Sequence, residues 1–109
     1  MTFCALSSAK GMDIKMSKVL IIGGGAAGMM AAVAAGENVH EVWLYEKNDR
    51  LGRKLFITGK GRCNITNAGD METLFASVMS NPKFLYSSFY TFTNDQVIDF
   101  FEELGVRTK

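Results

Sequence analysis

The chain has 109 residues, of which 48% are hydrophobic and 8 are phenylalanine, and its formal net charge is +1. That length is typical of one domain, and the nearly neutral charge disfavours a nucleic-acid-binding or a membrane-surface protein. Two cysteines cannot form a disulfide framework, and no apolar run approaches the ~20 residues of a membrane span. A reducing cytoplasm is therefore the expected location.

The first seventeen residues lack the long apolar core of a secretory signal. Met12 and Met16 could each begin translation shortly before the first apolar run. We therefore expect residues 1–17 to form a disordered or extended N-terminus, and residues 18–109 to form the domain.

Residues 18–46 contain the most specific pattern in the chain. An apolar strand at 18–23 runs into a glycine-rich turn, a helix of small residues follows, and a second strand at 40–46 ends in Glu46. This order predicts an α/β fold with the Rossmann-type βαβ unit that binds dinucleotides. Glycine-rich turns alone are weak evidence, but here strand, helix, second strand and acid agree. The alternative, a small-residue helix packed tightly for structural reasons alone, leaves the position of the acid unexplained.

Each glycine of the turn has a separate expected role. Gly23 lets the chain turn sharply, Gly25 lets the backbone approach a pyrophosphate, and Gly28 lets the helix pack closely on the sheet. The first helical residues, Ala26 and Ala27, then present amide groups and the positive end of the helix dipole to the phosphates.

Glu46 lies 23 residues after Gly23, at the end of the second strand. An acid at this place can accept hydrogen bonds from both ribose hydroxyls, which favours FAD or NAD over the 2′-phosphorylated adenosine of NADP.

Residues 47–67 form a basic segment. Glycine and threonine positions at 52, 58, 59 and 61 are expected to interrupt regular structure there. Bases and glycine amides suit a pyrophosphate and the edge of a flavin ring, but a solvated basic loop is equally compatible with the pattern. A nucleic-acid surface is disfavoured because no aromatic residues are interleaved with the bases. The six bases are Lys47, Arg50, Arg53, Lys54, Lys60 and Arg62.

After residue 46 the chain shows no further clear strand, so the sheet is expected to be incomplete. Apolar spacing predicts helices over 70–80, 83–92 and 94–104. Thr93 and Gln96 form a capping box before the last helix, and Gly105 is its expected stop.

The aromatic residues of the 83–92 helix are interpreted as core rather than as a substrate lid, because aromatic side chains mostly serve packing. One histidine, His40, cannot make a metal site, and no metal-binding or nucleophile pattern appears. The aromatic residues in question are Phe84, Tyr86, Phe89, Tyr90 and Phe92.

Three motifs, GGGAAGMMAA, YEKNDRLGRKLFITGKGRCNITN and FFEELGV, resemble the N-terminal part of a bacterial family of NAD(P)/FAD-dependent oxidoreductases. This family is of the BaiN or aminoacetone oxidase-like type, and the resemblance covers residues 18–109. It implies a two-dinucleotide-binding-domain flavoprotein with non-covalent FAD, reduced in the full-length family by NAD(P)H. Family members are several-fold longer, so the later substrate domain and the segment that completes the fold and covers the flavin would lie outside these residues.

The resemblance also implies roles for individual residues. Gly23, Gly25, Gly28 and Glu46 correspond to pyrophosphate and ribose contacts, and Arg53 and Lys54 lie near the adenosine ribose and phosphates. Lys47, next to the acid, is a further candidate cofactor contact. The loop near the flavin ring corresponds to Gly61, Arg62, Cys63 and Asn64.

Cys63 occupies a loop in which flavin disulfide reductases carry their first redox cysteine. No second cysteine follows it, so a dithiol mechanism is excluded within the chain unless Cys4 approaches. We expect Cys63 to be a small buried residue near the flavin.

Three functional interpretations follow. The leading one is an FAD-binding N-terminal segment of a flavin-dependent oxidoreductase, with no catalytic residue or substrate assigned. The second is a non-catalytic nucleotide-binding module for FAD, NAD or ADP-like ligands. The third is an inactive truncated gene product whose incomplete sheet exposes its edges.

Overall fold

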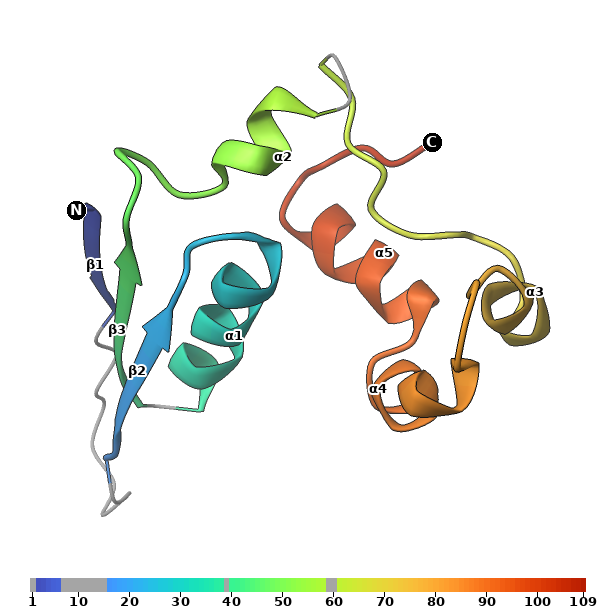
Figure 1. The fold of residues 1–109 in the computed structure, drawn as a ribbon, viewed down its shortest axis with the longest axis horizontal. Coiled ribbons are helices and arrows are strands. Elements are labelled where there is room, and N and C mark those ends of the chain that lie inside the picture. The colour runs from blue at the N-terminus through green and yellow to red at the C-terminus, as the bar shows by residue number, and fades with distance from the viewer. Residues whose placement is uncertain (1, 7–15, 39, 59–60) are drawn as a thin grey trace. The chain divides into compact units, whose positions relative to one another are not determined.

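The computed structural model describes residues 2–6, 16–38, 40–58 and 61–109, and the chain divides into two compact units, Met1–Cys63 and Asn64–Lys109 (Figure 1). Each unit has its own architecture. The first is a small sheet with helices, and the second is helical. No helix in the described residues is long and apolar enough to cross a membrane.

The sheet of the first unit has three strands in the order β1-β3-β2. β2 (Lys18–Ile22) pairs in parallel with β3 (Glu41–Glu46), as the sequence predicts, and helix α1 (Ala26–Glu37) connects them. β1 (Thr2–Leu6) pairs with β3 in the antiparallel direction, within the N-terminus expected to be disordered or extended. The remainder of that segment, residues 7–15, lies outside the described residues. The predicted α/β class and the predicted incomplete sheet are both confirmed.

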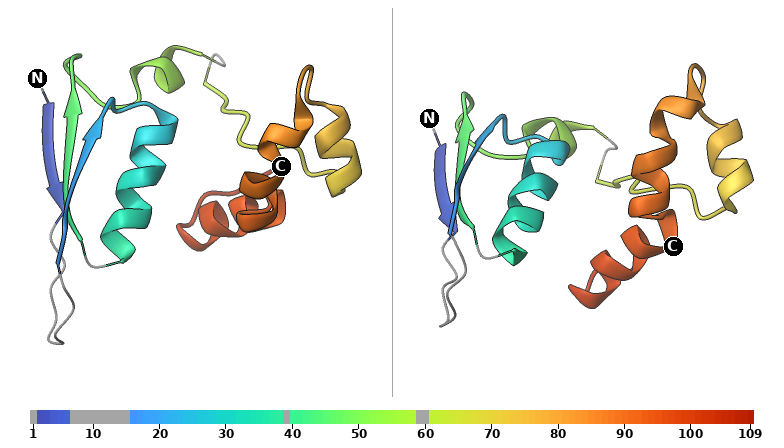
Figure 2. Two further views of the ribbon diagram at one scale, coloured as in Figure 1. Left: turned by 60° about the horizontal axis from the view of Figure 1, so that its bottom comes forward. Right: turned by 90° about the horizontal axis from the view of Figure 1, so that it is seen from below.

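One face of the sheet is covered by α1, which lies on the same side of the strands in every view (Figure 2). Val19 stands opposite Val42 and Ile21 opposite Leu44 across the parallel pair. The core consists of Val42, Leu44 and Ala32 of α1, with Ile21 packed against it. Alanines favour the helix and keep its surface flat, so it can lie close to the β-branched residues of the strands.

The opposite face of the same two strands is apolar but open. Leu20 and Ile22 are 64% and 83% exposed, and they stand beside Trp43 and Tyr45 of β3. Within the described residues of the first unit, no helix covers this face and β2 has a neighbouring strand on one side only. Side chains alternate along both strands, so one face of the sheet is covered by α1 and the other remains exposed and apolar.

The basic segment contains a short helix, α2 (Arg53–Ile57), so the prediction that glycines interrupt all regular structure there was wrong. Gly52 has a φ of +64°, a left-handed conformation that suits glycine, and it sets the start of the helix. Thr58 returns to extended backbone and ends the helix, and its hydroxyl donates to the Lys54 carbonyl at 2.7 Å.

The second unit contains α3 (Met71–Ala76), the 3₁₀ turn η1 (Pro82–Leu85), α4 (Tyr86–Thr91) and α5 (Asn94–Glu103). The helix predicted over 70–80 is shorter than expected. The segment predicted as one helix over 83–92 is a 3₁₀ turn followed by α4, and Pro82 occupies the first turn.

Local caps define the ends of these helices. The Asp70 carboxylate accepts from the Thr73 N–H at 2.8 Å, and both halves of the predicted capping box of α5 are formed. Gly105 follows α5 with a φ of +85°, as expected of a glycine stop.

Phe75 of α3 is the centre of the aromatic packing in this unit. Its ring lies 4.5 Å from Tyr86, 5.3 Å from Phe89 and 5.8 Å from Tyr90, centroid to centroid. Of these three rings only Phe89 is half-buried, so the core interpretation holds for Phe89 and was wrong for Tyr86, Tyr90 and Phe92, which are exposed. Phe84 is 78% exposed, which places it outside the cluster.

Asn94, the first residue of α5, is buried, and its amide group donates to the carbonyls of Asn67 and Gly69 at 2.8 and 2.7 Å. This contact joins the irregular segment before α3 to the last helix.

Candidate functional site

The glycine turn begins at Gly23, which follows the last residue of β2. Its φ is +102°, and its N–H still donates to the Tyr45 carbonyl at 2.7 Å. The chain thus stays bound to β3 up to the turn and then leaves the sheet abruptly. A residue with a side chain rarely adopts this conformation, so the first glycine of the motif is required by the backbone.

Gly28 permits the close approach of α1 to the end of β2. A Cβ atom on this residue would lie 1.9 Å from the carbonyl oxygen of Gly23, far inside van der Waals contact. Because the obstructing atom is backbone, it cannot move aside as a side chain could. The start of the helix is therefore fixed close to the carboxyl end of the strand.

Gly25 differs from the other two glycines because nothing in the protein fills the space beside it. A Cβ atom there would meet no atom within 4 Å, and the φ of −78° is open to any residue. Gly25 is the N-cap of the 12-residue helix α1, no side chain caps that end, and Ala26 and Ala27 are exposed. Open amides at the positive end of a helix attract anions, each contact contributing about 0.3–1 kcal/mol when exposed.

Glu46 ends β3 with its side chain buried beside the turn, 8% exposed. Its Oε2 accepts from the Gly24 N–H at 2.8 Å, and its Oε1 accepts from the backbone and side-chain amides of Asn48 at 2.8 and 2.6 Å. These donors, the Asn48 N–H foremost and then the Gly24 N–H, lower the pKa of Glu46 below its ordinary value although burial opposes them. The carboxylate is thus held in its charged form.

Sequence reasoning did not single out Gly24 as a site residue. It is buried, a Cβ there would meet Leu51 Cδ2 at 2.4 Å, and its carbonyl accepts from the Gly52 N–H at 2.7 Å. The only signal in the sequence was the run of three glycines, in which the motif leaves the middle position unspecified.

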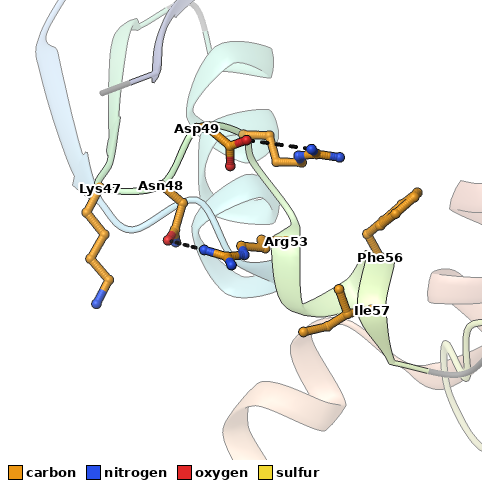
Figure 3. Close-up of a pocket in the computed structure, with 7 residues that line it drawn as sticks. Lys47, Asn48, Asp49, Arg53, Phe56 and Ile57 are labelled. Atoms are coloured by element: carbon orange, nitrogen blue, oxygen red, sulfur yellow. Dashed lines mark hydrogen bonds and ion pairs between the residues drawn. The ribbon is translucent and has the colours of Figure 1, made fainter.

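A pocket of about 520 Å³ opens next to the end of β3 (Figure 3). Arg53 crosses it to donate to Asn48 Oδ1 at 3.1 Å, and the guanidinium of Arg50 lies 5.7 Å from the centre of the Phe56 ring. The resemblance grouped Lys54 with Arg53, but Lys54 is not among the residues that line this pocket. The lining residues are Lys47, Asn48, Asp49, Arg50, Arg53, Phe56 and Ile57.

Lys47 and Arg53 were expected at the site, whereas Asn48, Phe56 and Ile57 were not. An asparagine two residues after the acid could have been recognised from its tendency to form side-chain-to-backbone turns. The contribution of Phe56 and Ile57 depends on α2, the short helix that the sequence did not reveal.

The four residues expected near the flavin ring lie in irregular backbone where the two units divide, and all four are exposed. Cys63 is among them, so the expectation of a buried cysteine was wrong. These residues follow the undescribed positions 59–60. They are Gly61, Arg62, Cys63 and Asn64.

Comparison with known families gives one match, the HI0933-like protein Rossmann domain, over residues 17–109. The chain is 37% identical over 98 residues to the 3-dehydro-bile acid delta(4,6)-reductase of Clostridium scindens, which covers 86% of the chain and 23% of that protein. It is 37% identical over 87 residues to the ribosomal RNA dihydrouridine synthase of Escherichia coli, covering 80% of the chain and 21% of that protein.

The NADH oxidase of Thermoanaerobacter brockii is 52% identical over 40 residues, which is 37% of the chain and 6% of that protein. The chain therefore spans about a quarter or less of these relatives. No solved structure matches it with significance.

Proposed function

Because the chain belongs to the HI0933-like family and carries its Rossmann domain, we propose that it is the N-terminal FAD-binding part of a flavin-dependent NAD(P)H oxidoreductase. A relative named as a reductase and another named as an NADH oxidase support an oxidoreductase. The resemblance to bacterial FAD-dependent oxidoreductases, stated from the motifs, agrees with the family match.

The observation that carries this proposal is the difference between Gly28 and Gly25. Gly28 is fixed by contact with the protein itself, whereas the space beside Gly25 is empty and adjoins the uncapped start of α1. A glycine that packing does not require, at a helix end that lacks a cap, suits the approach of a pyrophosphate to backbone amides.

The ribose of the adenosine would contact Glu46. An ionised carboxylate offers about four acceptor positions, and the described hydrogen bonds use three of them, so Oε2 can still accept from a ribose hydroxyl. Lys47 and Arg53 follow directly and line the adjacent pocket, where their positive charges would favour the phosphates.

Bound FAD would supply the hydride chemistry of the enzyme. The residues of this chain would bind the cofactor and orient it. We assign Gly61, Arg62, Cys63 and Asn64 to the flavin side on the resemblance alone.

The remaining part of the full-length protein would complete the fold and supply the substrate site. Two features support this, the open apolar face at Leu20 and Ile22 and the one-sided pairing of β2. In a parallel sheet both faces are normally covered, so an open face calls for further polypeptide.

The test compares Gly25→Ala with Gly36→Ala, two alanines placed where a Cβ meets nothing within 4 Å. After incubation with FAD and removal of the excess, the wild type and Gly36→Ala should retain flavin absorption near about 450 nm. Gly25→Ala should fold equally well and lose most of that absorption, because its methyl group occupies the space meant for the pyrophosphate. Equal retention by both variants would contradict the assignment.

Reduction of the bound flavin distinguishes the enzyme from a non-catalytic nucleotide-binding module. Bleaching of the flavin bands by NADH or NADPH is expected of an oxidoreductase. Tight flavin binding without bleaching by either would favour the module.

A further inference from the structure

Both backbone polar groups of Gly24 form hydrogen bonds. Its N–H donates to Glu46 Oε2 at 2.8 Å, and its carbonyl accepts from the Gly52 N–H at 2.7 Å. Both partners are distant in sequence, and both belong to the stretch that leads from β3 into α2. The position of the glycine turn is therefore coupled to the segment that lines the pocket.

Glu46 extends this coupling further. While Oε2 holds Gly24, Oε1 holds both amides of Asn48, whose Oδ1 in turn accepts from Arg53 at 3.1 Å. One buried carboxylate thus connects the turn to a guanidinium group in the pocket. A Cβ atom on Gly24 would lie 3.2 Å from Glu46 Oε2, so a side chain there would crowd the carboxylate that accepts the Gly24 hydrogen bond.

We infer that Glu46 and Gly24 form a positioning clamp, which holds the glycine turn and the basic pocket in their binding geometry before any ligand arrives. The clamp rests on the proposed function, and it deepens it. Glu46 would contribute to the binding of the phosphates as well as to that of the ribose, because preorganised amides lose less freedom when the anion binds.

The clamp can be tested without any ligand. In amide hydrogen exchange on the unliganded chain, Gly24 and Gly52 should be protected, whereas Gly25, one residue away and exposed, should exchange rapidly. Exchange of Gly24 and Gly52 as rapid as that of Gly25 would overturn the inference, and this measurement requires no variant.

Glu46→Gln preserves the size of the side chain but replaces one acceptor oxygen with an NH₂ group, which cannot accept from an amide. Exchange at Gly24 or Asn48 should accelerate on the order of tenfold or more, since a hydrogen bond to a charged acceptor is lost. Glu41→Gln is the matched control, because Glu41 lies at the other end of β3 and contacts Trp43 and Lys18 instead. The inference fails if both variants accelerate exchange at Gly24 and Asn48 equally, or if Glu46→Gln accelerates exchange at neither residue.

Binding of three probes separates positioning from ribose contact. Glu46→Gln should weaken the binding of inorganic pyrophosphate as well as that of ADP and FAD if the clamp positions the turn, with larger factors for ADP and FAD, which also lose the ribose contact. Weakening of ADP and FAD with unchanged pyrophosphate binding would reduce Glu46 to a ribose contact and overturn the clamp. If the wild type bound none of the three, the proposed function would fail, whereas the exchange measurements would still decide whether the clamp exists.

Discussion

Each of the two units of this chain is stabilised by a different kind of internal contact. In the first, the decisive contacts join residues far apart in sequence, such as Gly24 to Glu46 and Gly24 to Gly52. In the second, the helix ends are fixed by neighbours within three residues, as at Asp70 and Thr93. The second unit has one long-range polar contact of note, the amide group of Asn94.

The comparison shows where precision is required. A turn that binds a pyrophosphate, as proposed, must place several amides at once, and contacts to the sheet through backbone and a buried carboxylate hold this turn in place. The helical unit instead packs around the half-buried ring of Phe75, against the half-buried Phe89 and the more exposed Tyr86 and Tyr90.

The largest expected effect concerns Gly28 in the first unit. Gly28→Val should destabilise the unit by about 3 kcal/mol, because the new side chain would overlap the Gly23 carbonyl. Urea unfolding monitored by the fluorescence of Trp43, the single tryptophan, measures this. Gly36→Ala serves as the control and should be neutral or stabilising, since it adds a methyl group to open space in a helix. Unchanged stability in Gly28→Val would show that α1 does not need its close approach to β2.

A smaller loss is expected from the aromatic cluster of the second unit. Phe75→Ala should cost about 2 kcal/mol, less than for a fully buried ring because Phe75 is half-buried. The helical circular dichroism signal should report the loss. If the units are stabilised independently, the Trp43 fluorescence transition should not move.

Phe84→Ala is the matched control for that cluster. Its ring is 78% exposed, so the change should remain within about 0.5 kcal/mol. A loss as large as that of Phe75→Ala would mean that Phe84 also belongs to the core.

A further loss is expected at the long-range contact of the second unit. Asn94→Ala leaves the carbonyls of Asn67 and Gly69 without this donor and should cost about 1–2 kcal/mol in thermal unfolding. Asp99→Ala, an equal truncation at an exposed position of the same helix, should change stability far less. Equal effects would show that Asn94 acts only through helix propensity.

The smallest expected effect is the loss of stability at low pH. The pKa of Glu46 is lowered by the amides of Asn48 and Gly24, and that of Asp70 by the N–H and hydroxyl of Thr73. Each carboxylate binds a proton more readily when unfolded, so its stabilising contribution is complete above the ordinary pKa values of 4.5 and 3.8. The contribution is lost as the pH falls from these values through the lower folded ones.

Melting temperatures measured between about pH 6 and pH 3 should reveal this loss. Glu46→Gln should flatten the pH dependence of the first unit, and Asp70→Asn that of the second. An unchanged slope in either variant would assign the acid sensitivity of that unit to other groups.

The motif-based predictions succeeded where the cause is local or steric. The order of strand, turn, helix and strand over residues 18–46 follows from apolar runs and from glycines, and the cap at Thr93 and the stop at Gly105 depend only on residues nearby. Helix lengths were less predictable. The 83–92 segment divides into a 3₁₀ turn that starts at Pro82 and the helix α4, whereas apolar spacing alone suggested one continuous helix.

Amino-acid sequence by itself therefore determined the βαβ unit, its glycine turn and its terminal acid, because strand and helix periods and the sterics of glycine are properties of short segments. Tertiary structure alone decided what Glu46 contacts, why Gly24 must be small, that β1 joins the sheet and that Cys63 is exposed. These features depend on which distant residues meet, and a linear pattern does not encode the distance between two backbones that fold onto one another.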